Sequence, residues 1–186
     1  DSGSSRGLGD VYKRQAQYKT DEDLQAVHQQ FPMIAVWDDH ESTDNSYRDG
    51  AGNHDPLTEG DWAARKQISQ QAYFEWLPIR PREPGNHSVI YRNFAFGDLI
   101  DLTMLDTRLE GRDEQLSIPA DPGRNDEDRH LISEQQMDFL LNSLSESNSQ
   151  WRFIGQQVMF AQLNIAEIPS LSERHAQLRG NLSAIN

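Results

Sequence analysis

Apolar runs separated by segments with helical spacing constrain the fold of this chain more than any other feature. The runs are Met33–Trp37, the two arms of Val89–Arg108, and Trp151–Leu163. They contain many of the β-branched and aromatic residues that favour strands. Strands that alternate with helices along a chain are typical of layered folds around a buried sheet. The sequence therefore predicts an α/β fold of the mixed type.

Three segments have the apolar spacing and the terminal residues of helices. In the first, Thr20 is a candidate N-cap, and three acidic residues follow it at the positive end of the helix. In the last, Ser133 and Gln136 have the spacing of a capping box ahead of an apolar face. The predicted helices are Thr20–Gln30, Asp61–Leu77 and Ser133–Ser145.

The apolar segment Val89–Arg108 has the pattern of a β-hairpin. Its two arms are separated by Gly97–Asp98, a dipeptide that is common in tight turns. Two polar stretches, Ser42–Gly60 and Leu109–Arg129, have the composition of long loops. Long loops in compact domains are commonly functional.

Composition excludes several classes of function. The formal net charge of −13 repels polyanions, so no binding to nucleic acid is expected. The chain has no cysteine, which excludes disulfides and thiolate metal ligands within it. No run approaches the roughly 20 apolar residues of a membrane-spanning helix. From Ala16 onward the sequence has no G-x-S-x-G elbow and no Gly-rich phosphate loop.

The run Met33–Trp37 changes abruptly into four polar residues, Asp38–Glu41. We expect a buried strand with these residues at its carboxyl end, where ligands bind in open α/β sheets. The oxygens of Asp39 suit a hard cation, and His40 is placed to hydrogen-bond a phosphoryl oxygen or a leaving group. The alternative is a solvated loop that follows a core strand.

Two other strings contain ligand-type residues in a less favourable context. Gly52–Asp55 spells the GNHD signature of binuclear metallophosphoesterases, but no strand pattern precedes it. Gly85–His87 lies in a proline-rich turn, where Asn and Gly are common. Both strings are interpreted as loop residues.

The LDTR string at Leu105–Arg108 also ends an apolar strand. Its arginine has the planar fork that matches a phosphate oxygen pair, so Arg108 is a candidate anion-binding residue. The alternative is an ion pair that closes the end of the strand. Because both strands run into one core, we expect Arg108 near the same sheet edge as Asp39.

The sequence resembles the PhoD-like alkaline phosphatases over nearly all of Tyr18–Leu163. The resemblance rests on WDDHE at Trp37–Glu41, on YRNFAFGDLIDLTMLDTR up to Arg108, and on WRFIGQQVMFAQL from Trp151. It implies an α/β/β/α metallophosphoesterase-type sandwich that hydrolyses phosphate monoesters or diesters. It further implies Fe3+ and Ca2+ as cofactors and an exported protein, either periplasmic or extracellular.

Carried onto this sequence, the resemblance places Asp39 at a metal-ligand position. Asp38 is a second metal candidate, and either Asp38 or Glu41 would orient the ligand shell. His40 takes the position of the neighbouring catalytic histidine, and Arg108 is the anion-binding member of the LDTR block. The family's other metal ligands would lie upstream of Ala16 and beyond the last residue.

Residues 1–15 resemble read-through of a sequencing adaptor, because DVYKRQ at Asp10–Gln15 matches its translation. We therefore expect a non-native tail at 1–15 and a partial phosphatase domain at 16–186, inactive by itself although the parent protein is an enzyme. The alternative from another class is a non-catalytic acidic module. In that case Asp38–Asp55 would be a calcium-binding or partner-binding loop.

Overall fold

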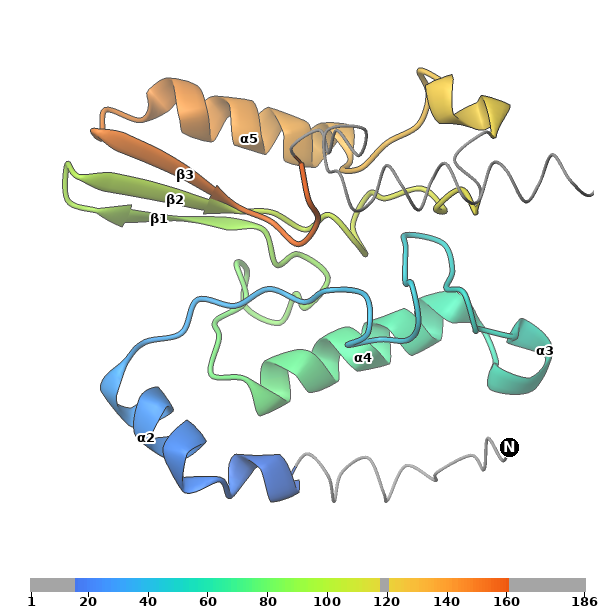
Figure 1. Ribbon diagram of the computed structural model, residues 1–186, viewed down its shortest axis with the longest axis horizontal. Coiled ribbons are helices and arrows are strands. Elements are labelled where there is room, and N and C mark those ends of the chain that lie inside the picture. Colours follow the sequence, from blue (N-terminus) through green and yellow to red (C-terminus); the bar gives the residue numbers. More distant parts are fainter. Residues whose placement is uncertain (1–15, 118–120, 161–186) are drawn as a thin grey trace, which may run out of the picture.

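The structure is a computed structural model that describes residues 16–117 and 121–160 of the chain (Figure 1). It contains both helices and strands, which confirms the predicted mixed α/β class. The elements are α2 (Glu22–Gln30), α3 (Pro56–Glu59), α4 (Trp62–Trp76), β1 (Arg92–Phe96), β2 (Ile100–Met104), the 3-10 helix η1 (Pro122–Asn125), α5 (Glu134–Glu146) and β3 (Trp151–Gly155). None of the helices within the described ranges has the length and apolar character needed to cross a bilayer.

The described sheet has three strands in the order β1-β2-β3. Strands β1 and β2 are antiparallel and pair Phe96 with Ile100 beside the turn, where Gly97 has a φ of 61°. This geometry confirms the predicted hairpin, and its positive φ explains the glycine. Strand β3 pairs in parallel with β2, and α5 forms the connection between them. Figure 1 shows α5 running alongside this sheet.

The longer predicted helices are confirmed, together with the residues that begin them. The Asp61 carboxylate accepts a hydrogen bond from Ala64 N at 3.0 Å at the start of α4. The Ser133 hydroxyl accepts one from Gln136 N at 3.1 Å at the start of α5. Both bonds satisfy backbone donors that a helix leaves unpaired in its first turn.

The first helix is confirmed, but its predicted cap is wrong. Asp21 is the N-cap of α2 and accepts a hydrogen bond from Leu24 N at 2.8 Å. The Thr20 hydroxyl instead donates to Gln17 O at 2.7 Å, in the turn that precedes the helix. A carboxylate at residue 21 is a stronger acceptor for the helix N–H groups than a hydroxyl one residue earlier.

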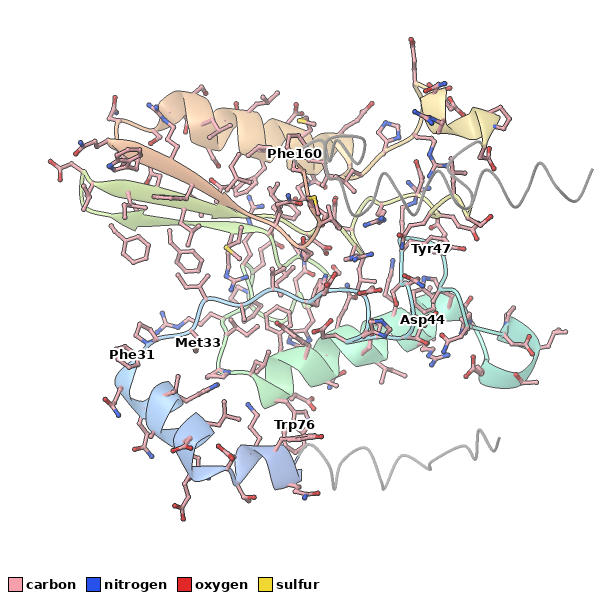
Figure 2. The ribbon with its side chains drawn as sticks, in the orientation of Figure 1. Phe31, Met33, Asp44, Tyr47, Trp76 and Phe160 are labelled. Carbon is pink, nitrogen blue, oxygen red and sulfur yellow. The ribbon has the colours of Figure 1, made fainter. Side chains whose placement is uncertain are left out.

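The predicted buried strand Met33–Trp37 is wrong. The segment has no strand pairing with any described residue, and burial is complete only at its end: Met33 is 52% exposed and Trp37 is 1% exposed. Figure 2 shows Phe31 and Met33 at the outer end of the segment. Its carbonyls accept hydrogen bonds from side chains instead: Arg92 Nη2 donates to Ala35 O at 2.7 Å.

The last predicted strand is shorter than expected. Strand β3 ends at Gly155, residues 156–160 continue as irregular backbone, and residues 161–163 lie outside the described part of the chain. The described residues contain one sheet, so the second sheet of the expected sandwich is not among them.

The apolar core connects α4 with the irregular segments beside it. Trp37 packs edge-on against Tyr73 and Phe74 of α4, with ring centroids 5.6 and 6.2 Å apart. Trp62, Ile90 and Leu109 complete the buried cluster. Figure 1 shows the segment after α2 passing between α4 and the sheet. Burial of Trp37 therefore fixes the position of the polar residues that follow it.

Candidate functional site

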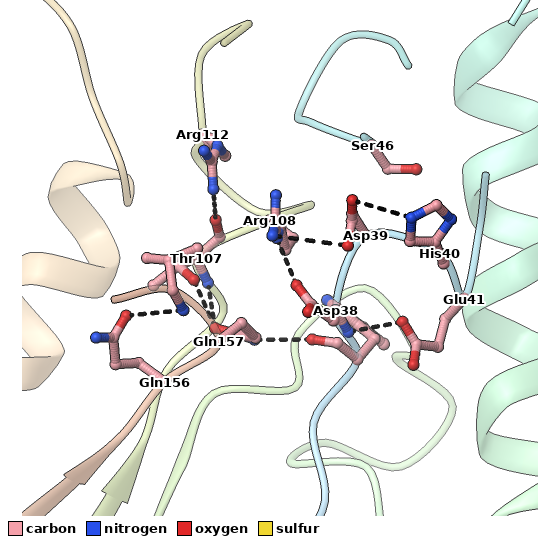
Figure 3. Close-up of polar contacts among 12 residues, drawn as sticks. Asp38, Asp39, His40, Glu41, Ser46, Thr107, Arg108, Arg112, Gln156 and Gln157 are labelled. Carbon is pink, nitrogen blue, oxygen red and sulfur yellow. Dashed lines mark hydrogen bonds and ion pairs between the residues drawn. The ribbon is translucent and has the colours of Figure 1, made fainter. Parts of the chain in front are cut away.

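The segment Asp38–Glu41 meets the segment that follows β2 (Figure 3). Arg108 Nε lies 2.6 Å from Asp38 Oδ1, and Arg108 Nη2 lies 3.6 Å from Asp39 Oδ1. The predicted proximity of Arg108 to Asp39 is therefore confirmed, although residues 33–37, which lead into Asp39, form no strand. The interpretation of Asp39 as a metal ligand consequently depends on this juxtaposition and not on a strand end.

Burial distinguishes the members of this cluster. Arg108 is 9% exposed and Asp39 is 7% exposed, whereas about half of the Asp38 side chain is accessible. Electrostatic attraction is stronger in such a partly desolvated position than in open water. The guanidinium is consequently held in one orientation by two carboxylates.

His40 lies at the open side of the cluster. Its side chain is 73% exposed, and its Nε2 is 3.7 Å from Asp39 Oδ2 and 3.6 Å from Asp44 Oδ1. Glu41 turns back and accepts a hydrogen bond from Asp38 N at 2.8 Å. The imidazole is thus accessible to a ligand, and it lies beside two carboxylates.

The side-chain amide of Gln157 joins the two segments that form the cluster. Its Nε2 donates to Trp37 O at 2.9 Å and to Leu105 O at 3.0 Å. Its Oε1 accepts from Thr107 N at 3.1 Å and from the Thr107 hydroxyl at 2.6 Å. One residue just after β3 therefore sets the spacing between Trp37 and Thr107, the neighbours of Asp38 and Arg108.

The backbone of Asp106 is held in the same way by Gln136 of α5. Gln136 Oε1 accepts from Asp106 N at 2.7 Å, and Gln136 Nε2 donates to Asp106 O at 2.9 Å. Asp106 Oδ1 in turn accepts from the backbone N–H groups of Arg108 and Leu109, both at 2.9 Å. The turn that presents Arg108 is thus fixed by hydrogen bonds at successive residues.

Burial raises the pKa of the Asp106 carboxyl to about 6. The two backbone N–H groups and the Trp37 indole oppose this shift, because they favour the carboxylate. Neither Trp37 Nε1 nor Asp106 Oδ2 completes a hydrogen bond in this conformation. The carboxyl is therefore only partly stabilised in its charged form.

The predicted capping box is correct in only one of its two halves. Ser133 caps the backbone of Gln136, but the Gln136 side chain does not return to Ser133 N. Glu110 takes that role: its Oε2 lies 3.2 Å from Ser133 N, and it also accepts from Gln136 Nε2 at 2.6 Å. The Gln136 side chain instead binds the buried backbone of Asp106, a distant partner that the local sequence pattern does not indicate.

The GNHD string has the structural role expected of loop residues. Asn53 Oδ1 accepts hydrogen bonds from the Thr43 hydroxyl and from Asp44 N. The His54 ring packs on Trp62, with centroids 5.2 Å apart, and its Nδ1 lies 3.1 Å from Arg65 Nη1. These contacts order the loop next to α4.

The described residues do not form a metal site by themselves. No group of three or more His, Asp or Glu side chains suited to a metal ion occurs within residues 16–117 and 121–160. Asp39 supplies oxygen donors of the type that Ca²⁺ and Fe³⁺ accept, but one Asp38 oxygen is bound to Arg108. Iron or calcium would need most of its ligands from elsewhere.

Sequence reasoning did not identify the residues that hold this cluster together. Gln157 follows an apolar strand, which is the same signal that identified Asp39 and Arg108. The local pattern marks Gln136 only as a helix-capping residue and Asp106 only as a partner for an ion pair with Arg108. Their contacts are with residues 26 to 120 positions away or with backbone groups, which local patterns do not encode.

Comparisons with known proteins identify the family of this chain. The family model for PhoD-like phosphatases matches residues 5–183. Alkaline phosphatase D of Bacillus subtilis (strain 168) is 35% identical over 166 residues, which are 84% of this chain and 27% of that protein. The solved structure of PhoD aligns with a TM-score of 0.68 and 33% identity over 81% of this chain and 29% of that one. The chain thus spans less than a third of these relatives, and it belongs to the PhoD-like phosphatase family of hydrolases.

Proposed function

We propose that the whole protein containing this chain hydrolyses phosphate esters, and that Arg108 binds a phosphoryl oxygen of the substrate. The observation that carries the proposal is the nearly buried Arg108 guanidinium, oriented by Asp38 and Asp39. Asp38 Oδ1 pairs with Nε, and Asp39 Oδ1 lies 3.6 Å from Nη2. A guanidinium held in this way matches the geometry of a phosphate.

His40 and Asp39 complete the proposed roles. The exposed His40 imidazole would donate a hydrogen bond to the leaving-group oxygen. Asp39 would contribute one oxygen ligand to a metal, whose other ligands lie outside the described residues. Bound Fe3+ and Ca2+ would supply Lewis-acid activation in the whole protein. The four-layer sandwich and export to the periplasm or exterior belong to the same proposal.

The chain alone should show no appreciable turnover. Two-metal catalysis requires several ligands to clamp each ion at once, and the described residues offer one well-placed carboxylate. The alternative of a calcium-binding acidic loop has less support. Its candidate oxygens already have partners: Asp38 binds Arg108, Asn53 binds Thr43, and Asp55 caps α3 through Leu57 N at 3.0 Å.

The test compares the whole protein with variants at Arg108. Hydrolysis of p-nitrophenyl phosphate and of its bis ester is measured with iron and calcium present. Arg108→Gln should lower kcat/KM by about 10²–10³, the usual effect of removing a donor to developing oxyanion charge. Arg80→Gln is the matched control, because Arg80 is exposed on the segment after α4. Equal activity of the Arg108 variant and the control would refute the role of Arg108.

A further inference from the structure

An open pocket with a volume of about 450 Å³ begins at Arg112, four residues after Arg108 on the same segment. Its charged lining consists of Arg112, Asp113, Arg124, Arg129 and His130. Three arginines against one aspartate make this lining basic, although the chain carries a net charge of −13. A local reversal of sign in an acidic protein attracts anions to that place.

The aspartate of the pocket has its direct contacts with residues other than Arg112 and Arg129. Asp113 Oδ1 lies 2.9 Å from Arg48 Nη2, and its Oδ2 accepts from His130 N at 2.6 Å and lies 3.8 Å from His130 Nδ1. In the described part of the chain, neither Arg112 nor Arg129 has a carboxylate within 4.0 Å. Both donate to backbone carbonyls, Arg112 to Thr107 O and Arg129 to Glu114 O. Both guanidiniums therefore retain donors for an anion.

Arg112 connects this pocket with the proposed phosphate site. Its Nη1 lies 3.4 Å from Thr107 O, the carbonyl directly before Arg108. Figure 3 shows the side chains of Arg108 and Arg112 on the same segment. Burial lowers the pKa of Arg112, and the like charges of Arg108 and Arg129 act in the same direction, whereas Asp39 and Asp38 oppose the shift. The two arginines are therefore close enough to Arg112 to interact with it electrostatically.

We propose that this basic pocket binds a second anionic group of the substrate, while Arg108 binds the phosphoryl group. This inference rests on the proposed phosphoesterase function. The preferred substrates are then phosphate esters whose organic part itself carries a carboxylate or a phosphate. A neutral ester of the same shape would bind less well, because Arg112 and Arg129 would lose their counter-charge.

The test uses the whole protein and two matched substrates, 4-carboxyphenyl phosphate and 4-carbamoylphenyl phosphate. They have similar shape, but only the first has a charged group away from the ester. The ratio of their kcat/KM values should be about tenfold in favour of the carboxylate, the usual scale for a hydrogen bond to a charged group. Arg112→Gln and Arg129→Gln should each bring the ratio toward one.

The ratio is independent of overall losses in activity or folding, because both substrates meet the same protein. Arg80→Gln is again the control and should keep the wild-type ratio. A ratio near one in the wild type, or a ratio unchanged in both variants, would overturn the inference while turnover of both esters still supports the proposed function. If neither ester is hydrolysed by the whole protein with its metals, the proposed function fails and this inference fails with it.

Discussion

Replacing Gln136 by methionine should strongly destabilise the fold. Gln136 is fully buried, and its side-chain amide makes hydrogen bonds to Asp106 N, Asp106 O and Glu110 Oε2. Methionine has a similar length but offers no equivalent donor or acceptor. The substitution therefore leaves two buried backbone groups without a partner and removes one partner of a carboxylate.

The magnitude follows from those lost partners. A buried polar group left unsatisfied costs about 1–3 kcal/mol, so the two backbone groups of Asp106 together cost about 2–6 kcal/mol. Burial of the additional apolar surface of methionine returns about 1 kcal/mol. We expect a net loss of about 3 kcal/mol in the free energy of unfolding, most of it from the backbone of one residue.

Urea unfolding followed by circular dichroism measures this loss. With an m-value of about 2 kcal/mol/M, the midpoint should fall by about 1.5 M. Gln135→Met is the control, because Gln135 is the exposed neighbour on the same helix and should change stability by less than about 0.5 kcal/mol. If the two variants unfold at the same urea concentration, the buried Gln136 amide does not stabilise the turn at Asp106.

Two further predictions concern the same turn. Burial raises the pKa of Asp106 to about 6, so the folded state binds this proton more tightly than the unfolded state does. The free energy of unfolding should therefore increase as the pH falls from about 6 to about 4, and it should decrease again as the pH is raised through about 6. Urea unfolding across that range should show this gain, at most about 3 kcal/mol, in the wild type and not in Asp106→Asn; parallel curves would contradict it. The substitution Gln157→Leu removes the acceptor of Thr107 N, so hydrogen exchange of that amide should become at least about tenfold faster. Unchanged protection of the amide would show that Gln157 does not hold the two segments together.

The elements that sequence reasoning located are those with local signals. The hairpin has apolar arms around Gly97, and α4 begins at the carboxylate of Asp61. Each of these signals acts on residues only a few positions away, so it does not depend on how the rest of the chain folds. The meeting of Arg108 with Asp39 was predicted from a general rule about strand ends. The contact is observed, but the rule does not explain it, because residues 33–37 form no strand.

The incorrect predictions concern features that depend on distant partners. Residues 33–37 have the composition of a strand, but a strand also needs a ladder partner, and no described residue provides one. Gln136 and Gln157 are similar cases, because a glutamine after a capping serine or an apolar strand is ordinarily exposed. Only the fold shows that both side chains bind backbone groups of residues 105–107.

The use of glutamines around this turn has a physical reason. Leu105 N is the last backbone donor after β2 that still pairs across the sheet, with Gly155 O at 2.9 Å. The Leu105 carbonyl and the backbone groups of Asp106 and Thr107 lie beyond the ladder and need other partners. Side-chain amides replace that ladder, since each offers both a donor and an acceptor without adding charge. Among the described residues, the carboxylates within 4.0 Å of the Arg108 guanidinium are consequently those of Asp38 and Asp39 alone. A carboxylate in place of Gln136 or Gln157 would compete with the phosphate of a substrate for the Arg108 guanidinium.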